Sequence, residues 1–326
     1  MTGTFAIPNE DEGSLCAVRL LDPDPNVRRV AILALADEGD PDSIPRFVQA
    51  LREDAAHEVR QAAAFALAEW EQDDVVQALC SALTDAHQTV REAAAQGLAE
   101  LKDPRSANAL LKWAGHREAF VREAVLRGLR ELRSANAFTV AMQALNDETS
   151  SVRSEAIAVL GWLKDARALK PLAALATSDP DAHVRRAATC TLGFAADDDE
   201  SIASALLIAL RDAAWQVREQ AAATLGKLRA QPTGAQLVAA LEDPYWQVRL
   251  SAVRALGQLR YGRAALPIAE LLRHPIGNLR KEAALALGEI KRRDTLDALR
   301  HALGDGDPDV RKSARIAIAQ IEQADA

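Results

Sequence analysis

Residues 213–228 read AAWQVREQAAATLGKL, and nearly the whole chain can be written as variations on this stretch. Its Val-Arg pair, with Leu-Arg in one case, occurs ten times at intervals of 31 to 33 residues, and we call the first residue of each pair an anchor. The anchors are Val27, Val59, Val90, Val121, Val152, Val184, Val217, Val248, Leu279 and Val310. Because self-similarity at a fixed period of this size is typical of solenoids, the sequence predicts an array of tandem repeats.

Each repeat contains two helical patterns separated by a turn. Counted from Val217, apolar or small residues fall at positions 0, +4, +7, +8 and +11, which is one stripe at helical spacing. The second helix of each repeat is therefore predicted to begin at the Val-Arg pair. The first helices are predicted at residues 14–21, 42–51, 73–83, 105–113, 135–145, 166–176, 200–210, 234–241, 263–272 and 295–303. We expect an all-α fold of about ten two-helix repeats, with residues 1–12 as a flexible tail and residues 13–326 as a single solenoid domain.

Composition agrees with a helical array and shows an uneven charge. Hydrophobic residues, mainly Ala and Leu, make up 49% of the chain and aromatic residues only 4%, and small residues allow close helix packing. The net charge is −8, but residues 1–150 hold 25 acidic and 15 basic side chains while residues 151–326 hold 22 and 24. Such an asymmetry is expected to orient binding partners more than it shapes the fold.

The cysteines and the absence of apolar segments predict the compartment. Cys16, Cys80 and Cys190 are far apart and form no CxxC pair, which is typical of reduced thiols in a reducing compartment. No apolar run approaches the roughly 20 residues of a membrane span, and the first twelve residues lack the basic start and apolar middle of a signal peptide. We expect a soluble, cytoplasmic monomer that does not contact membranes.

An acidic residue stands five positions before eight of the ten anchors, as Asp212 does before Val217. Each is followed six residues later by the arginine of its pair, so we expect a ladder of Asp–Arg contacts in the turns inside the repeats, setting turn geometry and register. His116 and His274 replace the acid in two repeats. We expect those two repeats to be locally looser, with faster amide exchange than their neighbours.

The pattern Asp-x-x-x-x-Val-Arg-x-x-Ala-x-x-x-Leu-Gly-x-Leu, clearest at residues 212–228, 243–259 and 274–290, resembles the short HEAT-like repeats of the phycobilisome-lyase type. The resemblance implies a right-handed α-α superhelix, the HEAT-repeat solenoid of armadillo-type folds, in which the Val-Arg helices line the concave face. It covers about residues 14–323 and names no single task. Relatives of this type include bilin lyase subunits, adaptors, chaperone-like factors and the iron enzyme deoxyhypusine hydroxylase.

No catalytic constellation accompanies the repeats. The hydroxylase resemblance implies His-Glu pairs just after the basic residue of the second helices, but those positions hold other residues, and His57-Glu58 precedes its Val-Arg pair. The acidic run at residues 197–200 is interpreted as a helix cap rather than a metal site. The glycines at position +9, among them Gly193, Gly226, Gly257 and Gly288, are interpreted as packing positions and not as a phosphate loop. We therefore expect no enzyme activity, no cofactor and no metal, although a lyase-like activity stays open.

Positions +2, +6 and +10 of the second helices are predicted to face a partner. Repeats 2 to 4 place Glu69, Glu100 and Glu131 there, with Arg127 among them, while repeats 5 and 6 place Trp162, Cys190 and Phe194 there. Large apolar groups in a polar surface are typical of binding hot spots. The alternative is that both aromatic side chains fold into the core, and that the glutamates form an ordinary solvated face.

A second candidate lies just before two anchors, where Trp215, Tyr245 and Trp246 are predicted to form an aromatic ledge. A turn aromatic also often packs onto its own helix as a hydrophobic staple, so that alternative stays open. Trp70 and Trp113, at the ends of buried stripes, are predicted to be core residues.

The sequence predicts a non-catalytic scaffold or adaptor that holds a partner protein or peptide in its concave groove. One alternative is a bilin-lyase-like or chaperone-like factor that acts on a cofactor-bearing protein. Another is a nucleic-acid-binding HEAT-like protein, which the basic run Lys291-Arg-Arg293 favours. The calculated pI near 5.4 and the acidic surface of repeats 2 to 4 disfavour this last class, since they would repel phosphate.

Overall fold

The computed structural model describes residues 18–196 and 199–323, which contain α-helices, short 3-10 turns and loops but no strand. The chain forms two compact units, Met1–Leu163 and Lys164–Ala326, and each is described by itself. The expected tail at residues 1–12, the first half of the first predicted helix with Cys16, and two members of the acidic run at residues 197–200 lie outside the described residues.

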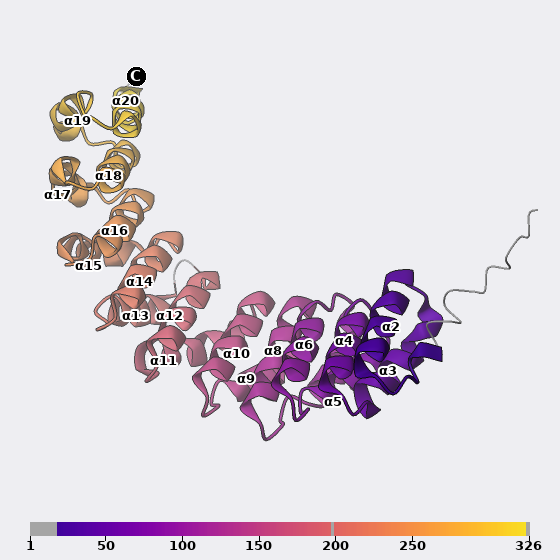
Figure 1. Ribbon diagram of the computed structural model, residues 1–326. Helices are drawn as coiled ribbons and strands as arrows, with labels where there is room; N and C mark the ends of the chain where they lie inside the picture. The colour runs from indigo at the N-terminus through magenta and orange to yellow at the C-terminus, as the bar shows by residue number, and fades with distance from the viewer. Residues whose placement is uncertain (1–17, 197–198, 324–326) are drawn as a thin grey trace, which may run out of the picture. The chain divides into compact units, whose positions relative to one another are not determined.

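The first unit consists of a helix followed by four helical hairpins (Figure 1). Its helices are α2 (Pro25–Glu38), α3 (Ile44–Glu53), α4 (His57–Leu67), α5 (Asp73–Ala82), α6 (Gln88–Ala99), α7 (Ala107–Leu111), α8 (Ala119–Leu132), α9 (Ala137–Ala144) and α10 (Ser150–Leu163). The even-numbered helices carry the anchors and pack side by side as one layer, which we call the Val-Arg layer. The odd-numbered helices form the second layer, here called the first-helix layer.

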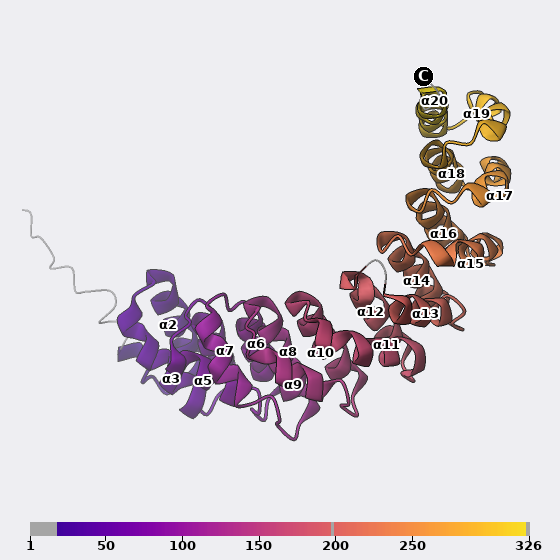
Figure 2. The ribbon, with the colours of Figure 1, turned by 180° about the vertical axis from the view of Figure 1, so that it is seen from behind.

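The second unit repeats this arrangement in five hairpins (Figure 2). Its helices are α11 (Leu169–Ser178), α12 (Ala182–Thr191), α13 (Glu200–Ala209), α14 (Trp215–Lys227), α15 (Gly234–Ala239), α16 (Trp246–Gln258), α17 (Ala265–Glu270), α18 (Gly277–Ile290), α19 (Leu296–Ala302) and α20 (Pro308–Glu322). Here too the even-numbered helices form the Val-Arg layer. The 3-10 turns of both units are η1 (Pro41–Ser43), η2 (Pro104–Ser106), η3 (Ala166–Ala168), η4 (Leu192–Phe194), η5 (Gln231–Thr233), η6 (Ala240–Glu242), η7 (Gly262–Ala264), η8 (Leu271–Arg273) and η9 (Arg293–Thr295).

The Val-Arg helices begin two residues earlier than predicted. In α14 the cause is Asp212, whose Oδ1 accepts a hydrogen bond of 2.8 Å from the Ala214 N–H. This side-chain turn leaves Ala214 extended, with φ −81° and ψ 121°, so the helix starts at Trp215 rather than at Val217. The same bond recurs in the other repeats that carry the acid, for example from the Ala56 N–H to Asp54.

The predicted apolar stripe forms the core. Val217, Ala221 and Leu225 are fully buried, and Leu228 is 4% exposed. The buried Thr224 hydroxyl donates to the Thr189 carbonyl of the preceding repeat at 3.2 Å, so its polar group is satisfied. Burial of each large side chain contributes roughly 1.5–3 kcal/mol, which makes contact between successive hairpins the main source of stability.

The +9 glycines allow successive Val-Arg helices to approach closely. A Cβ on Gly226 would lie 2.7 Å from Ala255 Cα of the next repeat and 2.5 Å from Gln258 Oε1. Gly257 and Gly288 meet their following repeats in the same way. The +10 side chain of one repeat therefore lies over the +9 glycine of the repeat before it.

Two predicted core residues are only partly buried. Trp70 and Trp113 are both half-buried, and the Trp113 ring lies 5.8 Å from the His116 ring at a tilt of 34°. Both stand at the ends of their helical patterns, where no further turn of helix covers them.

Candidate binding surface

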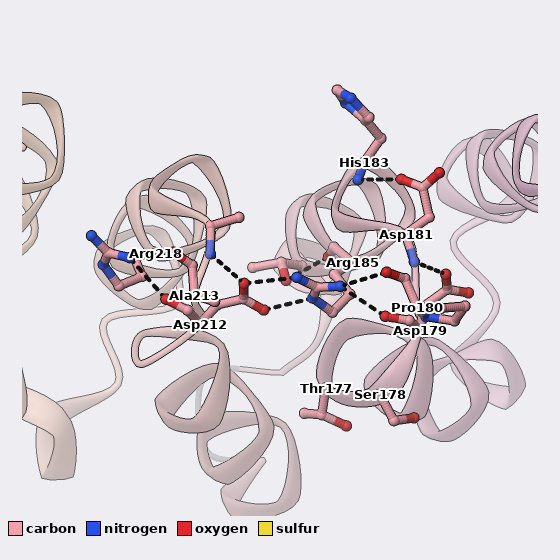
Figure 3. A network of polar contacts seen from close by, with 12 residues as sticks. Thr177, Ser178, Asp179, Pro180, Asp181, His183, Arg185, Asp212, Ala213 and Arg218 are labelled. Carbon is pink, nitrogen blue, oxygen red and sulfur yellow. Dashed lines mark hydrogen bonds and ion pairs between the residues drawn. The ribbon is translucent and has the colours of Figure 1, made fainter.

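The Asp–Arg ladder exists, but it joins neighbouring repeats rather than the two ends of one turn. In Figure 3 the Arg185 guanidinium donates to the Asp212 carboxylate of the following repeat, at 2.6 Å from Nε and 2.9 Å from Nη2. Its Nη1 donates to the backbone carbonyls of Asp179 and Pro180 in its own turn. The expected Asp–Arg contact inside each turn is therefore wrong, because the arginine reaches its own turn only through carbonyl oxygens.

The same bidentate contact recurs between other neighbouring repeats. The further pairs are Arg28–Asp54, Arg60–Asp85, Arg122–Asp147, Arg218–Asp243 and Arg280–Asp305. Burial by itself would raise the pKa of Asp212, but the hydrogen bonds from Arg185 and from the Ala214 N–H outweigh it and hold that pKa below its ordinary value. The ladder therefore contributes stability above about pH 4 and loses it as the pH falls below that value.

Each of the two histidines replaces only one of the two contacts of an aspartate: it accepts the backbone N–H bond in its turn but offers no carboxylate to the arginine of the preceding repeat. His274 Nδ1 accepts from the Ile276 N–H at 3.1 Å, as an aspartate oxygen would. In the neutral ring the proton is then on Nε2, which lies 3.4 Å from Arg249 Nη1, so two donors face each other. Arg249 Nε is buried without a hydrogen-bond partner among the described residues. This orphaned donor supports the expectation of a looser repeat around His274.

Replacing His274 by aspartate is expected to stabilise the protein by about 1–2 kcal/mol at pH 8, because Arg249 gains a charged acceptor. The gain should widen as the pH falls. Burial, with the charges of Arg249 and Arg280, lowers the pKa of His274 below its ordinary value. Its contribution is therefore present above about pH 6.5 and is lost as the pH falls through the lowered pKa. Urea unfolding of H274D and wild type at pH 8 and pH 5.5 measures both effects.

His116→Asp provides the matched control for this prediction. Arg91 is the arginine of the preceding repeat that would pair with residue 116. Its guanidinium already lies 6.0 Å from the Phe120 ring centroid, and none of its nitrogens is buried without a hydrogen-bond partner. H116D should therefore stabilise less than H274D. Equal gains in the two variants, or a gain for H274D that shrinks towards pH 5.5, would contradict the explanation.

The solvent-facing side of the Val-Arg layer in the first unit carries three exposed carboxylates, Glu69, Glu92 and Glu100. Gln88 and Gln96 donate to Glu92 and Glu100 from one helical turn away, and these contacts leave both negative charges uncompensated. This acidic part agrees with the predicted surface of repeats 2 and 3.

The predicted acidic surface does not extend unchanged into repeat 4. Glu123 pairs with Arg127 at 2.5 Å, and Glu131 pairs with Arg130 at 3.1 Å. Both arginines also reach Glu155 on α10 at 3.2 Å. Arg127 thus belongs to an internal network of two arginines and three glutamates, in which the exposed Glu131 shares Arg130 with Glu155.

Trp162 is exposed, as one of the two alternatives predicted, but the Arg133 side chain covers one face of its ring. It is 44% exposed on the Val-Arg side of α10. The Arg133 guanidinium, from the end of α8, lies 4.2 Å from the ring centroid, a cation–π contact. A partner would therefore meet a stacked Arg–Trp pair rather than an isolated aromatic ring.

An apolar patch on the same side of the first unit was missed by the sequence analysis. Val30, Leu33 and Phe65 are 53%, 45% and 43% exposed on the neighbouring helices α2 and α4. Leu33 and Phe65 both occupy position +6, where other repeats carry Gln96 or Arg127. Since position +6 is one of the predicted partner-facing positions, the sequence contained the signal for this patch.

The corresponding side of the second unit is more fully paired. Cys190 is exposed, whereas Phe194, in the turn η4, is half-buried. Arg254 pairs with Glu282 at 2.8 Å, and Lys281 approaches Asp309 at 3.5 Å. Trp162 lies in the first unit and Phe194 in the second.

The aromatic ledge of the second unit is partly formed. The Trp215 and Tyr245 rings stack with centroids 5.4 Å apart and an angle of 14°, and Arg218 lies 5.7 Å from the Tyr245 centroid. Tyr245 is 45% exposed, while Trp215 and Trp246 are half-buried. The two rings belong to successive repeats and cover each other, and Tyr245 stays exposed beside them.

Other kinds of site find little support in the described ranges. They contain no group of three or more side chains placed to ligate a metal, and no helix there is both long and apolar enough to span a bilayer. A cavity of about 870 Å³ between α5 and α7 is open and lined by charged residues such as Asp73, Asp74, Arg105 and Lys112. Burial raises the pKa of the Cys80 thiol to about 12, which leaves it without thiolate character.

Comparison with known proteins gives one family and several similar structures. A family model described as HEAT repeats matches residues 14–68, 44–130, 109–193, 202–275 and 264–326. None of the curated proteins compared with the chain matches it. An engineered protein of known structure is similar with a TM-score of 0.56 and 20% identity, over 96% of this chain and 99% of that one.

Two natural proteins give similar values. YibA of Escherichia coli has a TM-score of 0.61 at 18% identity, over 83% of this chain and 99% of YibA. Kap95p, solved with RanGDP, has a TM-score of 0.55 at 15% identity, over 95% of this chain and 45% of Kap95p. At these identities the likenesses concern the fold alone.

Proposed function

The chain belongs to the HEAT-repeat family, and from that premise we propose that it is a non-catalytic scaffold that binds a partner protein or peptide on the Val-Arg side of its first unit. The observation that carries this proposal is the apolar patch of Val30, Leu33 and Phe65 beside the exposed carboxylates Glu69, Glu92 and Glu100. Exposed apolar groups next to uncompensated charge are typical of interaction surfaces.

The chemistry of this surface indicates the kind of partner. The patch requires an apolar anchor, and the three carboxylates favour basic residues next to that anchor. An amphipathic segment with one apolar and one basic flank satisfies both requirements. The stacked Arg133–Trp162 pair, further along the same unit, would suit a planar or acidic group. The similar Kap95p binds RanGDP, which supports a protein-binding role for folds of this class.

The double variant Leu33→Ala with Phe65→Ala is expected to weaken partner binding at least about tenfold, because truncating a hot-spot residue costs 2 kcal/mol or more. Its stability should change little, since both side chains are substantially exposed. The partner is first identified by affinity purification from cells that express the protein naturally. Binding of the purified partner to each variant is then measured by calorimetry.

The matched control is Ile208→Ala with Leu266→Ala. These side chains are 59% and 58% exposed, but they lie on α13 and α17 in the first-helix layer of the second unit. The control should bind like wild type. If both double variants bind normally, or if L33A/F65A is strongly destabilised, the patch is part of the fold and not a docking site.

Membership of the phycobilisome-lyase type of HEAT repeats is a narrower proposal, which rests on the motif at residues 212–228. A visible-absorbance scan of protein purified from its natural source tests it. A bound tetrapyrrole would support a bilin-lyase-like factor, whereas colourless material would favour a general adaptor.

A further inference from the structure

In the second unit, the last three turns that lead from a Val-Arg helix to the next first helix carry a concentration of positive charge. Three successive turns, at residues 229–234, 260–265 and 291–296, contain six basic residues and one acidic residue, Asp294. The basic residues are all exposed, and we call them the basic ridge. They are Arg229, Arg260, Arg263, Lys291, Arg292 and Arg293.

Three ridge residues have a backbone conformation in which glycine would be less strained. Arg229, Arg260 and Lys291 have φ angles of 46°, 50° and 59° at position +12 of successive repeats. Helices often end on a left-handed residue, but that residue is usually glycine, because a Cβ there is unfavourable. The first repeat follows that rule with Gly39 at φ 64°. Every non-glycine residue with positive φ in the described ranges is basic, so these positions carry their charge at a conformational cost.

Four of the six ridge side chains make no polar contact with the described residues of the second unit. They are the side chains of Arg229, Arg260, Arg263 and Lys291, whereas the Arg292 side chain pairs with Asp294 at 2.6 Å. Arg133, which holds the same +12 position in the first unit, instead stacks on Trp162. A cation at a helix C-terminus gains from the helix dipole, but this effect does not account for Arg263, which follows the helix end by several residues.

The same edge of the first unit is acidic at its first two turns only. The turns at residues 39–44 and 71–76 contain five acidic residues and no basic residue, whereas those at residues 102–107 and 133–138 contain three basic residues and one acidic residue. Helix capping operates at all of these turns, so capping alone does not explain why three successive turns of the second unit are basic while the first two turns of the first unit are acidic. The ridge is therefore a property of these particular repeats.

We propose that the basic ridge is a second docking surface, distinct from the Val-Arg surface, and that it binds an acidic α-helix of a partner protein. Successive Val-Arg helices pack directly, α14 on α16 and α16 on α18, so the three +12 charges are spaced by roughly one interhelical distance of 8–10 Å. Glutamates seven residues apart on a helix are about 10.5 Å apart on one face, which matches that spacing.

Nucleic acid fits the ridge less well. Each strand of B-DNA presents a phosphate about every 3.4 Å along its axis, so charges at the spacing of the repeats would meet about one phosphate in three. The chain as a whole also carries a net charge of −8. An oligonucleotide is therefore an outcome of the test and not the proposed occupant.

The test uses the full chain and fluorescence anisotropy. The probe is a fluorescein-labelled, alanine-rich helical peptide with glutamates seven residues apart. A second peptide of the same composition has its glutamates adjacent, and oligodeoxythymidine serves as the nucleic acid. The main variant is R229G/R260G/K291G. Glycine accepts positive φ without strain, so this variant should fold at least as well as wild type while lacking three ridge charges.

The spaced peptide should bind wild type more tightly than the clustered peptide, and R229G/R260G/K291G should bind it about tenfold less tightly. Binding should weaken when salt rises from about 0.05 M to about 0.5 M. The control R186Q/R211Q/R273Q removes the same charge from exposed positions outside the ridge and should bind like wild type. Equal binding to wild type and the glycine variant, equal loss in the control, or a preference for the oligonucleotide would overturn the proposal.

Discussion

Replacing Arg185 by alanine is expected to lower the free energy of unfolding by about 3 kcal/mol, because one side chain joins two repeats through four hydrogen bonds. The substitution removes both donors to the Asp212 carboxylate and the donor shared by the Asp179 and Pro180 carbonyls. The carboxylate is largely buried and would keep its charge with only the Ala214 N–H as a partner. Breaking such a pair costs more than forming it contributes.

The measurement is urea unfolding followed by circular dichroism at 222 nm. Stability in a repeat array is a sum of terms for single repeats and for neighbouring interfaces. Loss of the Arg185 contact should therefore broaden the transition as well as shift it, since α12 and α14 become less strongly coupled. Arg185→Lys keeps the positive charge but lacks the planar guanidinium that donates to both oxygens of Asp212. It should therefore restore less than half of the unfolding free energy that R185A loses.

Arg186→Ala is the control on the same helix. Arg186 is exposed, and removing its side chain should change stability by less than about 0.5 kcal/mol. If R186A and R185A are equally destabilised, or if R185A unfolds like wild type, the ladder does not couple the repeats.

Replacing Gly226 by alanine should destabilise the protein by about 2 kcal/mol, although the same change in an open helix would stabilise it by up to about 1 kcal/mol. The sign is decided by the neighbouring helix. The new Cβ would lie 2.7 Å from Ala255 Cα, which is backbone and cannot rotate away. Separating the two helices to relieve this contact would loosen the packing of α14 against α16, and overpacking of this kind typically costs 1–3 kcal/mol.

Gly262→Ala is the matched control for this substitution, and both variants are measured by urea unfolding. A Cβ on Gly262 would meet only Arg292 Cδ, at 4.0 Å, the end of a flexible side chain. G262A should be neutral or slightly stabilising. A stabilised G226A would show that the helices can separate at no cost, and position +9 would then not be the close-packing point of the repeat.

Several contacts of the candidate site could not be predicted from the sequence, for physical reasons. Arg218 could have reached Asp212, six residues before it, or Asp243, twenty-five residues after it. The spacing favoured the nearer aspartate, but the direction of the arginine at the start of its helix selects the carboxylate of the next repeat. Glu131 and Trp162 were correctly placed on the exposed side of their helices. Their partners, Arg130 and Arg133, were not predicted.

The sequence by itself determined the repeat period, the two helices of each repeat and the buried stripe at 0, +4, +7, +8 and +11, because these depend on local spacing along one helix. The tertiary structure alone decided which charges and rings remain available to a partner. Neighbouring repeats pair Arg127 with Glu155, cover one face of Trp162 and leave Leu33, Phe65 and Arg260 without a covering side chain. Such availability depends on contacts between residues about thirty positions apart, which the pattern inside a single repeat does not contain.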